Sequence, residues 1–140
     1  MREISVAAAI LINPEGRTLL VRKRGTLRFM QPGGKPEAGE SFVAAAAREI
    51  GEELGLRVAP AALTAHGVFT APAANEPDTI VVAHVFSLRT AEAVRAAAEI
   101  EEAVWIDPRE GTALPLAALT AEHLLPLARR LAAEPEAALV

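Results

Sequence analysis

Hydrophobic and polar residues follow each other along the chain in a pattern that predicts strands on both sides of one central helix. Short apolar runs bounded by turn residues predict strands at residues 4–12, 18–24, 63–70, 79–88 and 103–106. The segment Asn13-Pro14-Glu15-Gly16 has the chemistry of a tight turn, so the first two strands are expected to form a hairpin. Residues 90–98 are rich in alanine and favour neither state.

A helical period follows the Gly- and Pro-rich loop of residues 29–36. Ser41 is placed to cap a helix over residues 42–54, and Gly55 is placed to end it in a left-handed conformation. Apolar side chains recur at helical spacing over residues 120–134, which predicts a closing amphipathic helix. Strands before and after a central helix indicate an α/β fold with a mixed sheet.

The length of 140 residues fits one domain, and neither a repeat nor a linker divides the chain, so we expect a single domain over residues 1–140. The absence of cysteine excludes a disulfide framework, a thiolate zinc site and a cysteine nucleophile. No apolar run approaches the roughly 20 residues that cross a bilayer, and the N-terminus has no cleavable signal pattern. We therefore expect a cytoplasmic protein with no membrane partner.

Charge is distributed unequally between residue types. Of the 18 acidic residues 16 are Glu, of the 14 basic residues 12 are Arg, and the net charge is −4. A domain with this sign is not expected to bind long nucleic acid through a general basic surface.

Three carboxylates share one face of the predicted central helix. Glu49, Glu52 and Glu53 stand at i, i+3 and i+4, where uncompensated like charges destabilise a helix, and only Arg48 is near enough in sequence to reach them. A hard divalent cation such as Mg²⁺ or Mn²⁺ resolves the repulsion, because it prefers oxygen ligands and retains waters that a phosphate can replace. A solvated acidic surface is the alternative.

The spacing around these carboxylates is far more specific than the cluster itself. Gly34 is followed after five residues by Glu40 and after seven more by Arg48-Glu49-Ile50-Gly51-Glu52-Glu53-Leu54-Gly55-Leu56. This is a complete match to the Nudix box over residues 34–56, expected by chance on the order of once in a million chains of this composition. The chain therefore resembles a Nudix hydrolase of the small, MutT-like type, from about Ile4 to Asp107.

The resemblance implies an α/β/α sandwich in which a mixed β-sheet lies between helices. It also implies an enzyme that splits a diphosphate linkage with the help of Mg²⁺, or of Mn²⁺ in its place. Glu49, Glu52 and Glu53 match the positions that hold the metal, Gly34 matches a position whose backbone carbonyl can coordinate it, and Glu99 is the candidate for one more carboxylate.

The same resemblance assigns roles in catalysis. Arg48 is expected to orient the glutamates by ion pairing, and Glu40 is expected to be structural, tying the loop to the helix. Metals neutralise a diphosphate and acidify a bound water, whose proton a carboxylate accepts. We assign Glu52 as the general base, with Glu53 as the alternative.

Candidate substrate ligands lie outside the box. Arg22, Arg24 and Lys35 are expected to meet phosphates, although a solvated strand face is an equal alternative for the two arginines. Phe69, like Met30 and Phe86, is a candidate for lining a base pocket, against the alternative of an ordinary core residue.

Other polar residues outside the box are less distinctive. Asn75, beside Glu76 in a polar connection, is a candidate for contacting a base edge. The three histidines have no ligand spacing and are expected to be structural; they are His66, His84 and His123.

The expected substrate is a nucleoside triphosphate, oxidised forms included, or a nucleoside diphosphate joined to another group. The protein is expected to act as a monomer or homodimer. An ADP-ribose or dinucleotide pyrophosphatase is one alternative, because Pro72 lies sixteen residues after Leu56, where such members of the family carry a proline. A module that binds a nucleotide without cleaving it is the other, and the intact set of Glu49, Glu52 and Glu53 argues against it.

Overall fold

A mixed β-sheet forms the centre of the molecule. The computed structural model describes residues 1–134, and its sheet has the strand order β4-β5-β1-β2-β6. These strands are β1 (Arg2–Ile12), β2 (Thr18–Lys23), β4 (Thr64–Pro72), β5 (Thr79–Arg89) and β6 (Ile100–Ile106). A two-residue strand, β3 (Gly33–Gly34), pairs with β1 beside this path. Strands β1 and β5 are parallel, and the other pairs are antiparallel.

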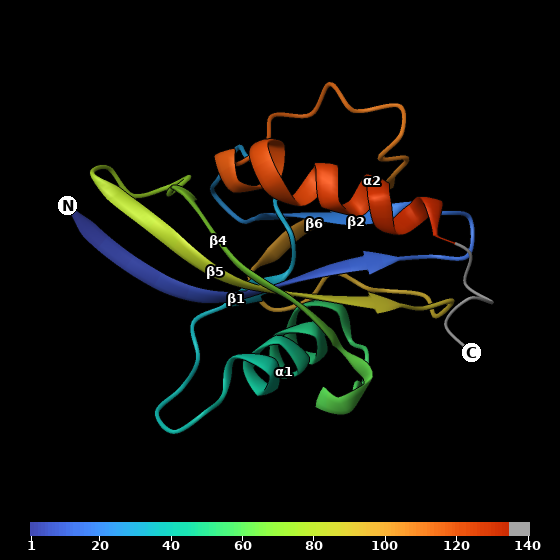
Figure 1. Ribbon diagram of the computed structural model, residues 1–140, viewed down its shortest axis with the longest axis horizontal. Coiled ribbons are helices and arrows are strands. Elements are labelled where there is room, and N and C mark those ends of the chain that lie inside the picture. Colours follow the sequence, from blue (N-terminus) through green and yellow to red (C-terminus); the bar gives the residue numbers. More distant parts are fainter. Residues whose placement is uncertain (135–140) are drawn as a thin grey trace.

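Two helices cover opposite faces of the sheet, α1 (Phe42–Leu54) on one and α2 (Leu125–Ala133) on the other (Figure 1). The alternation of side chains along β1 explains both contacts. Ile10 and Ile12 pack in the cluster that includes Leu127 of α2, whereas Leu11 packs in the cluster that includes Ile50 of α1. The predicted sandwich of a mixed sheet between helices is confirmed.

Local capping chemistry sets the ends of α1. The Ser41 hydroxyl oxygen accepts a hydrogen bond from the Ala44 N–H at 3.2 Å, and Gly55 ends the helix with a φ of 75°. Both ends are those predicted. The second predicted helix begins at Thr120, but as a π-helical turn (Thr120–Leu124) that continues into α2.

The predicted hairpin between β1 and β2 is correct only at its turn. The two strands share the pair Ile12–Thr18 and then diverge, since β1 pairs with β5 along its whole length while β2 pairs with β6. The divergence leaves the β1 edge open to β3, so Ala7 and Ala8 pair with the two glycines. Residues Ala7–Ile12 are buried, which is the pattern of a strand covered on both faces.

The alanine-rich segment 90–98 forms neither helix nor strand. The backbone N–H groups of Arg95 and Ala97 donate to the carbonyls of Leu54 and Glu53, which satisfies two carbonyls at the end of α1. Strand β6 starts at Ile100, earlier than predicted.

No helix within residues 1–134 is long and apolar enough to cross a lipid bilayer. The part of the single-domain prediction that covers residues 135–140 lies outside the described residues.

Candidate active site

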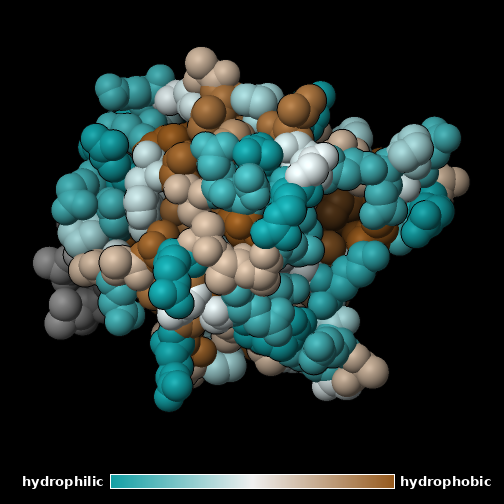
Figure 2. Space-filling model, turned by 180° about the vertical axis from the view of Figure 1, so that it is seen from behind, coloured by the Kyte–Doolittle hydropathy of each residue, from teal (hydrophilic) through white to brown (hydrophobic). Residues whose placement is uncertain are grey.

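A cavity of about 500 Å³ opens beside α1. Its wall is built from β1, β3, the connection between β4 and β5, and the segment before α2. Figure 2 shows a hollow with an apolar floor next to the part of the molecule where β1 begins. The charged residues of the wall include Lys23, Lys35, Arg48, Glu49 and Glu99, and its larger apolar residues are Ile4, Val6, Met30, Val81 and Leu119.

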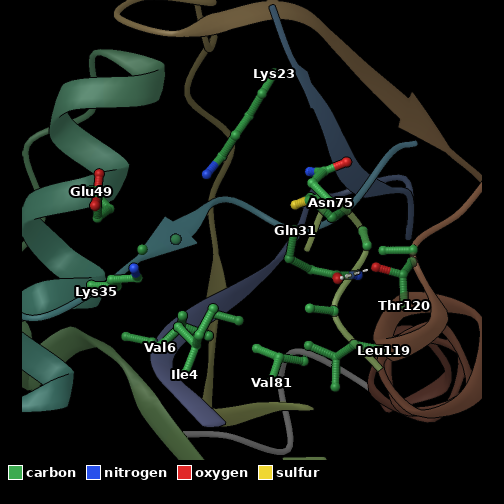
Figure 3. Close-up of a pocket in the computed structure, with 18 of the residues that line it drawn as sticks. Ile4, Val6, Lys23, Gln31, Lys35, Glu49, Asn75, Val81, Leu119 and Thr120 are labelled. Carbon is green, nitrogen blue, oxygen red and sulfur yellow. Dashed lines mark hydrogen bonds between the residues drawn. The ribbon is translucent and has the colours of Figure 1, made fainter. Parts of the chain in front are cut away.

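The two chemical kinds of wall are separated in space. Figure 3 shows Glu49 and Lys35 on one side of the cavity and Gln31 and Thr120 on the other, with the aliphatic side chains between them. The cavity therefore presents a charged end, an apolar middle and an amide end.

Arg48 organises the charged end by hydrogen bonding. Its guanidinium donates twice to the Glu40 carboxylate, at 2.9 Å each, and also to the Lys35 carbonyl at 3.2 Å and to Glu52 at 3.3 Å. The bonds from Arg48 are the main cause that lowers the pKa of Glu40 to about 2. This network ties the loop after β3 to the middle of α1.

Glu53 is a carboxylate buried without a counter-charge in contact. The residue is 1% exposed; Oε1 accepts a hydrogen bond from the Gly33 N–H at 3.2 Å, and Oε2 has no partner among residues 1–134. Burial, with the neighbouring Glu49 as the second cause, raises the pKa of Glu53 to about 8. A buried ionised carboxylate without a partner is costly, so this position favours either a proton or a cation.

Glu49 lies against Gly34 of β3. Its side chain is 15% exposed, and burial raises the pKa of its carboxyl group. A Cβ atom at Gly34 would overlap Glu49 Oε2, and one at Gly33, where φ is +154°, would overlap the Ala7 carbonyl oxygen. Glycine is thus required at both positions for β3 to fit between β1 and α1.

Lys23 and Glu99 complete the charged end. Lys23 Nζ lies 3.4 Å from Glu99 Oε1, and Figure 3 shows the Lys23 ammonium group directed into the cavity. Glu99 follows directly after the segment whose N–H groups bind the end of α1. A residue from the end of β2 and one from just before β6 therefore share the cavity wall with Glu49 of α1.

A family model described as the NUDIX domain matches residues 1–128. The chain belongs to the Nudix family. The prediction of a Nudix hydrolase is thereby confirmed.

Solved Nudix structures share the fold. The MutT protein from Methanosarcina mazei superposes with a TM-score of 0.73 at 22% identity, over 95% of this chain and 97% of that one. The NUDIX domain of Shewanella oneidensis NrtR, complexed with ADP ribose, gives 0.75 at 16% identity, over 94% and 89%. A Caenorhabditis elegans Ap4A hydrolase gives 0.68 at 19% identity, over 93% and 96%.

One curated protein shares a segment with this chain. Over 62 residues this chain is 48% identical to an octanoyltransferase from Myxococcus xanthus. The matched segment covers 41% of this chain and 17% of the octanoyltransferase. The match spans less than a fifth of the octanoyltransferase.

The Nudix cavity brings most of the predicted box residues together. Gly34, Lys35, Arg48 and Glu49 line it, as do Glu99 and Asn75. Glu53 lies buried behind them. Glu52 does not line the cavity; its side chain is 52% exposed and borders a shallow groove on the far side of Arg48.

Three predicted substrate ligands lie elsewhere. Arg22 donates to Glu102 at 2.9 and 3.1 Å, and Arg24 lies 3.5 Å from Glu101, because both arginines face the β6 side chains rather than the cavity. The half-buried ring of Phe69 packs against the core under α2 and against the His123 ring, with centroids 5.5 Å apart. Phe69 is therefore an ordinary core residue, which was the alternative to a role in lining a base pocket.

The cavity residues that sequence reasoning missed include Lys23, Gln31 and Thr120. Lys23 could have been found from strand alternation, because it faces opposite to its two arginine neighbours. Gln31 and Thr120 are 89 positions apart and carry no local signal.

The charged end of the cavity has the oxygen donors that a divalent cation prefers, but the side chains are not arranged around one ion. Among residues 1–134, no three His, Asp or Glu side chains are already arranged to hold a metal ion. The unpartnered Glu53 oxygen and the raised pKa of Glu49 and Glu53 nevertheless mark an excess of buried negative charge, supplied by the oxygen donors that Mg²⁺ prefers.

Proposed function

We propose that this Nudix protein hydrolyses a diphosphate linkage in a nucleoside triphosphate, oxidised forms included, or in a nucleoside diphosphate joined to another group. The observation that carries the proposal is the charged end of the cavity, where the half-buried Glu49 and the buried Glu53 lie near Lys23. Phosphate groups fit beside lysines, and the carboxylates fit a cation that a polyphosphate shares.

The proposed cofactor is Mg²⁺, or Mn²⁺ in its place, held by Glu49, Glu52 and Glu53 with Glu99 and the Gly34 carbonyl as further ligands. When bound, such an ion neutralises diphosphate charge and acidifies a bound water. Arg48 keeps the loop and the helix in register through its bonds to Glu40 and Lys35.

The chain's own residues divide the remaining tasks. Lys23 and Lys35 bind phosphate oxygens from the cavity wall. Glu52 accepts the proton of the attacking water after its exposed side chain turns past Arg48 toward the cavity, and Glu53 is the alternative for that role. The exposed position of Glu52 lets it exchange the proton with solvent, whereas Glu53 would have to pass it through a buried site.

Activity measurement tests the proposal directly. Purified protein should release phosphate or diphosphate from at least one member of a panel of nucleoside triphosphates, oxidised deoxynucleotides, ADP-ribose, dinucleoside polyphosphates and nucleotide sugars when Mg²⁺ is present. Chelation should abolish turnover. Glu52→Gln and Glu53→Gln should each lower kcat by about 100-fold or more, because a positioned base contributes that much.

The exposed Glu122 supplies the matched control, and Glu122→Gln should retain wild-type kcat. Circular dichroism of each variant separates loss of chemistry from loss of fold. Full activity in both Glu52→Gln and Glu53→Gln would contradict the mechanism.

A nucleotide-binding module without catalysis is the second candidate. The likeness of the fold to the NrtR NUDIX domain complexed with ADP ribose supports it. Calorimetry with ADP-ribose and Mg²⁺, followed by chromatography of the mixture, distinguishes the two: heat of binding with the ligand recovered intact favours the module.

A further inference from the structure

A buried amide at the wall of the cavity is satisfied at only one of its two ends. Gln31 is 6% exposed, and its Oε1 accepts a hydrogen bond from the fully buried Thr120 hydroxyl at 2.8 Å. Gln31 Nε2 is buried and has no partner in the part of the chain that the structure describes. Both residues line the cavity, and Figure 3 shows their bond at the end opposite Glu49. Buried donors are rarely left unpaired, so an unpaired donor in a cavity wall indicates a ligand atom.

The apolar middle of the cavity cannot distinguish one nucleotide base from another, so selectivity for the base depends on hydrogen bonds. None of the residues that line it, all within the described part of the chain, is aromatic. A planar base lying between Val6, Val81 and Leu119 gains apolar contact whichever base it is. Discrimination between bases must then come from polar groups at the amide end.

We propose that Gln31 selects the base of the nucleotide by donating its N–H₂ to a carbonyl oxygen on the base edge, and that Thr120 fixes the direction of this amide. The assignment rests on the proposed function, which places phosphates at the opposite, charged end. Because the Thr120 hydroxyl donates to Oε1, the amide offers hydrogens to the ligand. Guanine, hypoxanthine and uracil present an oxygen where adenine and cytosine present an amino group.

Hydrolysis of matched nucleotide pairs tests the selection. The kcat/KM for GTP and ITP should exceed that for ATP, and that for UTP should exceed that for CTP, by about 10- to 100-fold, since the wrong base leaves a donor facing a donor. Gln31→Leu should reduce each ratio to within about threefold. Gln31→Glu, assayed at a pH high enough to ionise the buried carboxyl group so that it only accepts hydrogen bonds, should reverse the preference.

Thr120→Val separates positioning from packing. Valine keeps the shape of threonine but removes the hydroxyl, so the amide is free to turn and the base preference should fall while the fold persists. Thr64→Val makes the same change at an exposed site on β4 and should keep the wild-type ratio. Thermal melting of each variant checks that the fold is intact.

Binding measured without a cation keeps the two proposals distinguishable. Tighter binding of GMP than of AMP, lost in Gln31→Leu, with no hydrolysis of any nucleotide, overturns the proposed function and supports the role of Gln31. Hydrolysis with equal rates for all bases, or a preference that survives Gln31→Leu, overturns the role of Gln31 alone. A wild-type preference for adenine and cytosine also overturns it, because the amide would then present its oxygen.

Discussion

The edge formed by β2 and β6 and the inner face of α1 both gather basic and acidic side chains, but they balance them differently. On the edge, Arg22 pairs with Glu102 and Arg24 pairs with Glu101, one base to one acid. The two acids are half exposed, at 50% of each side chain. On α1 a single arginine, Arg48, lies within 4 Å of four carboxylates.

The difference between the two clusters separates a structural role from a ligand-binding one. Balanced pairs at the surface need nothing further, and solvent screens them. Around α1 the carboxyl with the strongest need for a counter-charge, Glu53, is also the most deeply buried. An acidic cluster is therefore informative about ligands when it is both buried and unbalanced.

The largest expected effect concerns Glu53 and pH. Its pKa is raised from 4.5 to about 8 in the folded state, so the group is neutral in both states below pH 4.5 and ionised in both above pH 8. The free energy of unfolding therefore falls as pH rises from 4.5 to 8. In the absence of metal, Glu53 accounts for a loss on the order of 5 kcal/mol. Urea unfolding at pH 4.5 and 8.5 with chelator should show this loss in the wild type.

Glu53→Gln isolates that effect, because glutamine stays neutral and any cost of burying it does not depend on pH. The wild type should lose more stability between the two pH values than Glu53→Gln does, whereas Glu122→Gln should follow the wild type. Parallel pH curves for wild type and Glu53→Gln would show that Glu53 ionises freely, and the contrast between the clusters would disappear.

A smaller effect is expected from the lysine that joins the two clusters. Lys23→Met should raise KM by about 10- to 100-fold, the equivalent of one charge-assisted hydrogen bond. Arg22→Met should raise KM less, because its guanidinium is held by Glu102 outside the cavity. Equal increases in the two variants would instead favour the sequence-based assignment of Arg22 to phosphate.

The smallest effect is expected at the balanced edge. Glu102→Gln should cost about 0.2–1 kcal/mol of unfolding free energy, and less in high salt. Glu40→Gln, which also removes a glutamate holding an arginine by two bonds, should cost more, because Glu40 is 16% exposed where Glu102 is 50%. The stability that Glu40 provides is present above pH 4.5 and is lost as pH falls toward 2.

The features predicted correctly are those that depend on neighbours in sequence. Ser41 and Gly55 end α1 through bonds within a few residues. The helical period predicts one face for Glu49, Glu52 and Glu53, and of these Glu52 is the one that does not reach the cavity side. The spacing of the glycines, the arginine and the glutamates in residues 34–56 then correctly predicted the Nudix family.

The features that were missed depend on distant pairing. Alternation predicts one face for Arg22 and Arg24, but whether a side chain of β2 meets the cavity depends on which strand lies beside β2. The strand order also explains the failed hairpin, since no local pattern in residues 4–24 encodes the insertion of β3. Thr120 and Gln31 meet only once the chain has folded back across the sheet.

The backbone bonds from Arg95 and Ala97 to the end of α1 have a consequence for how this chain tolerates changes in length. They fix the segment just before Glu99 to the turn of α1 that carries Glu53, so the distance between these two carboxylates is held by the backbone. Residues 91–93 are exposed and lie between Thr90, whose N–H donates to the Ile12 carbonyl at 3.0 Å, and Val94, which packs against the core, so added residues there would only extend a surface connection. A deletion between Arg95 and Glu99 would leave helix carbonyls unpaired and displace an acidic side chain from the cavity wall. Length variation among natural or engineered versions of this chain should therefore be found before Arg95 and not after it.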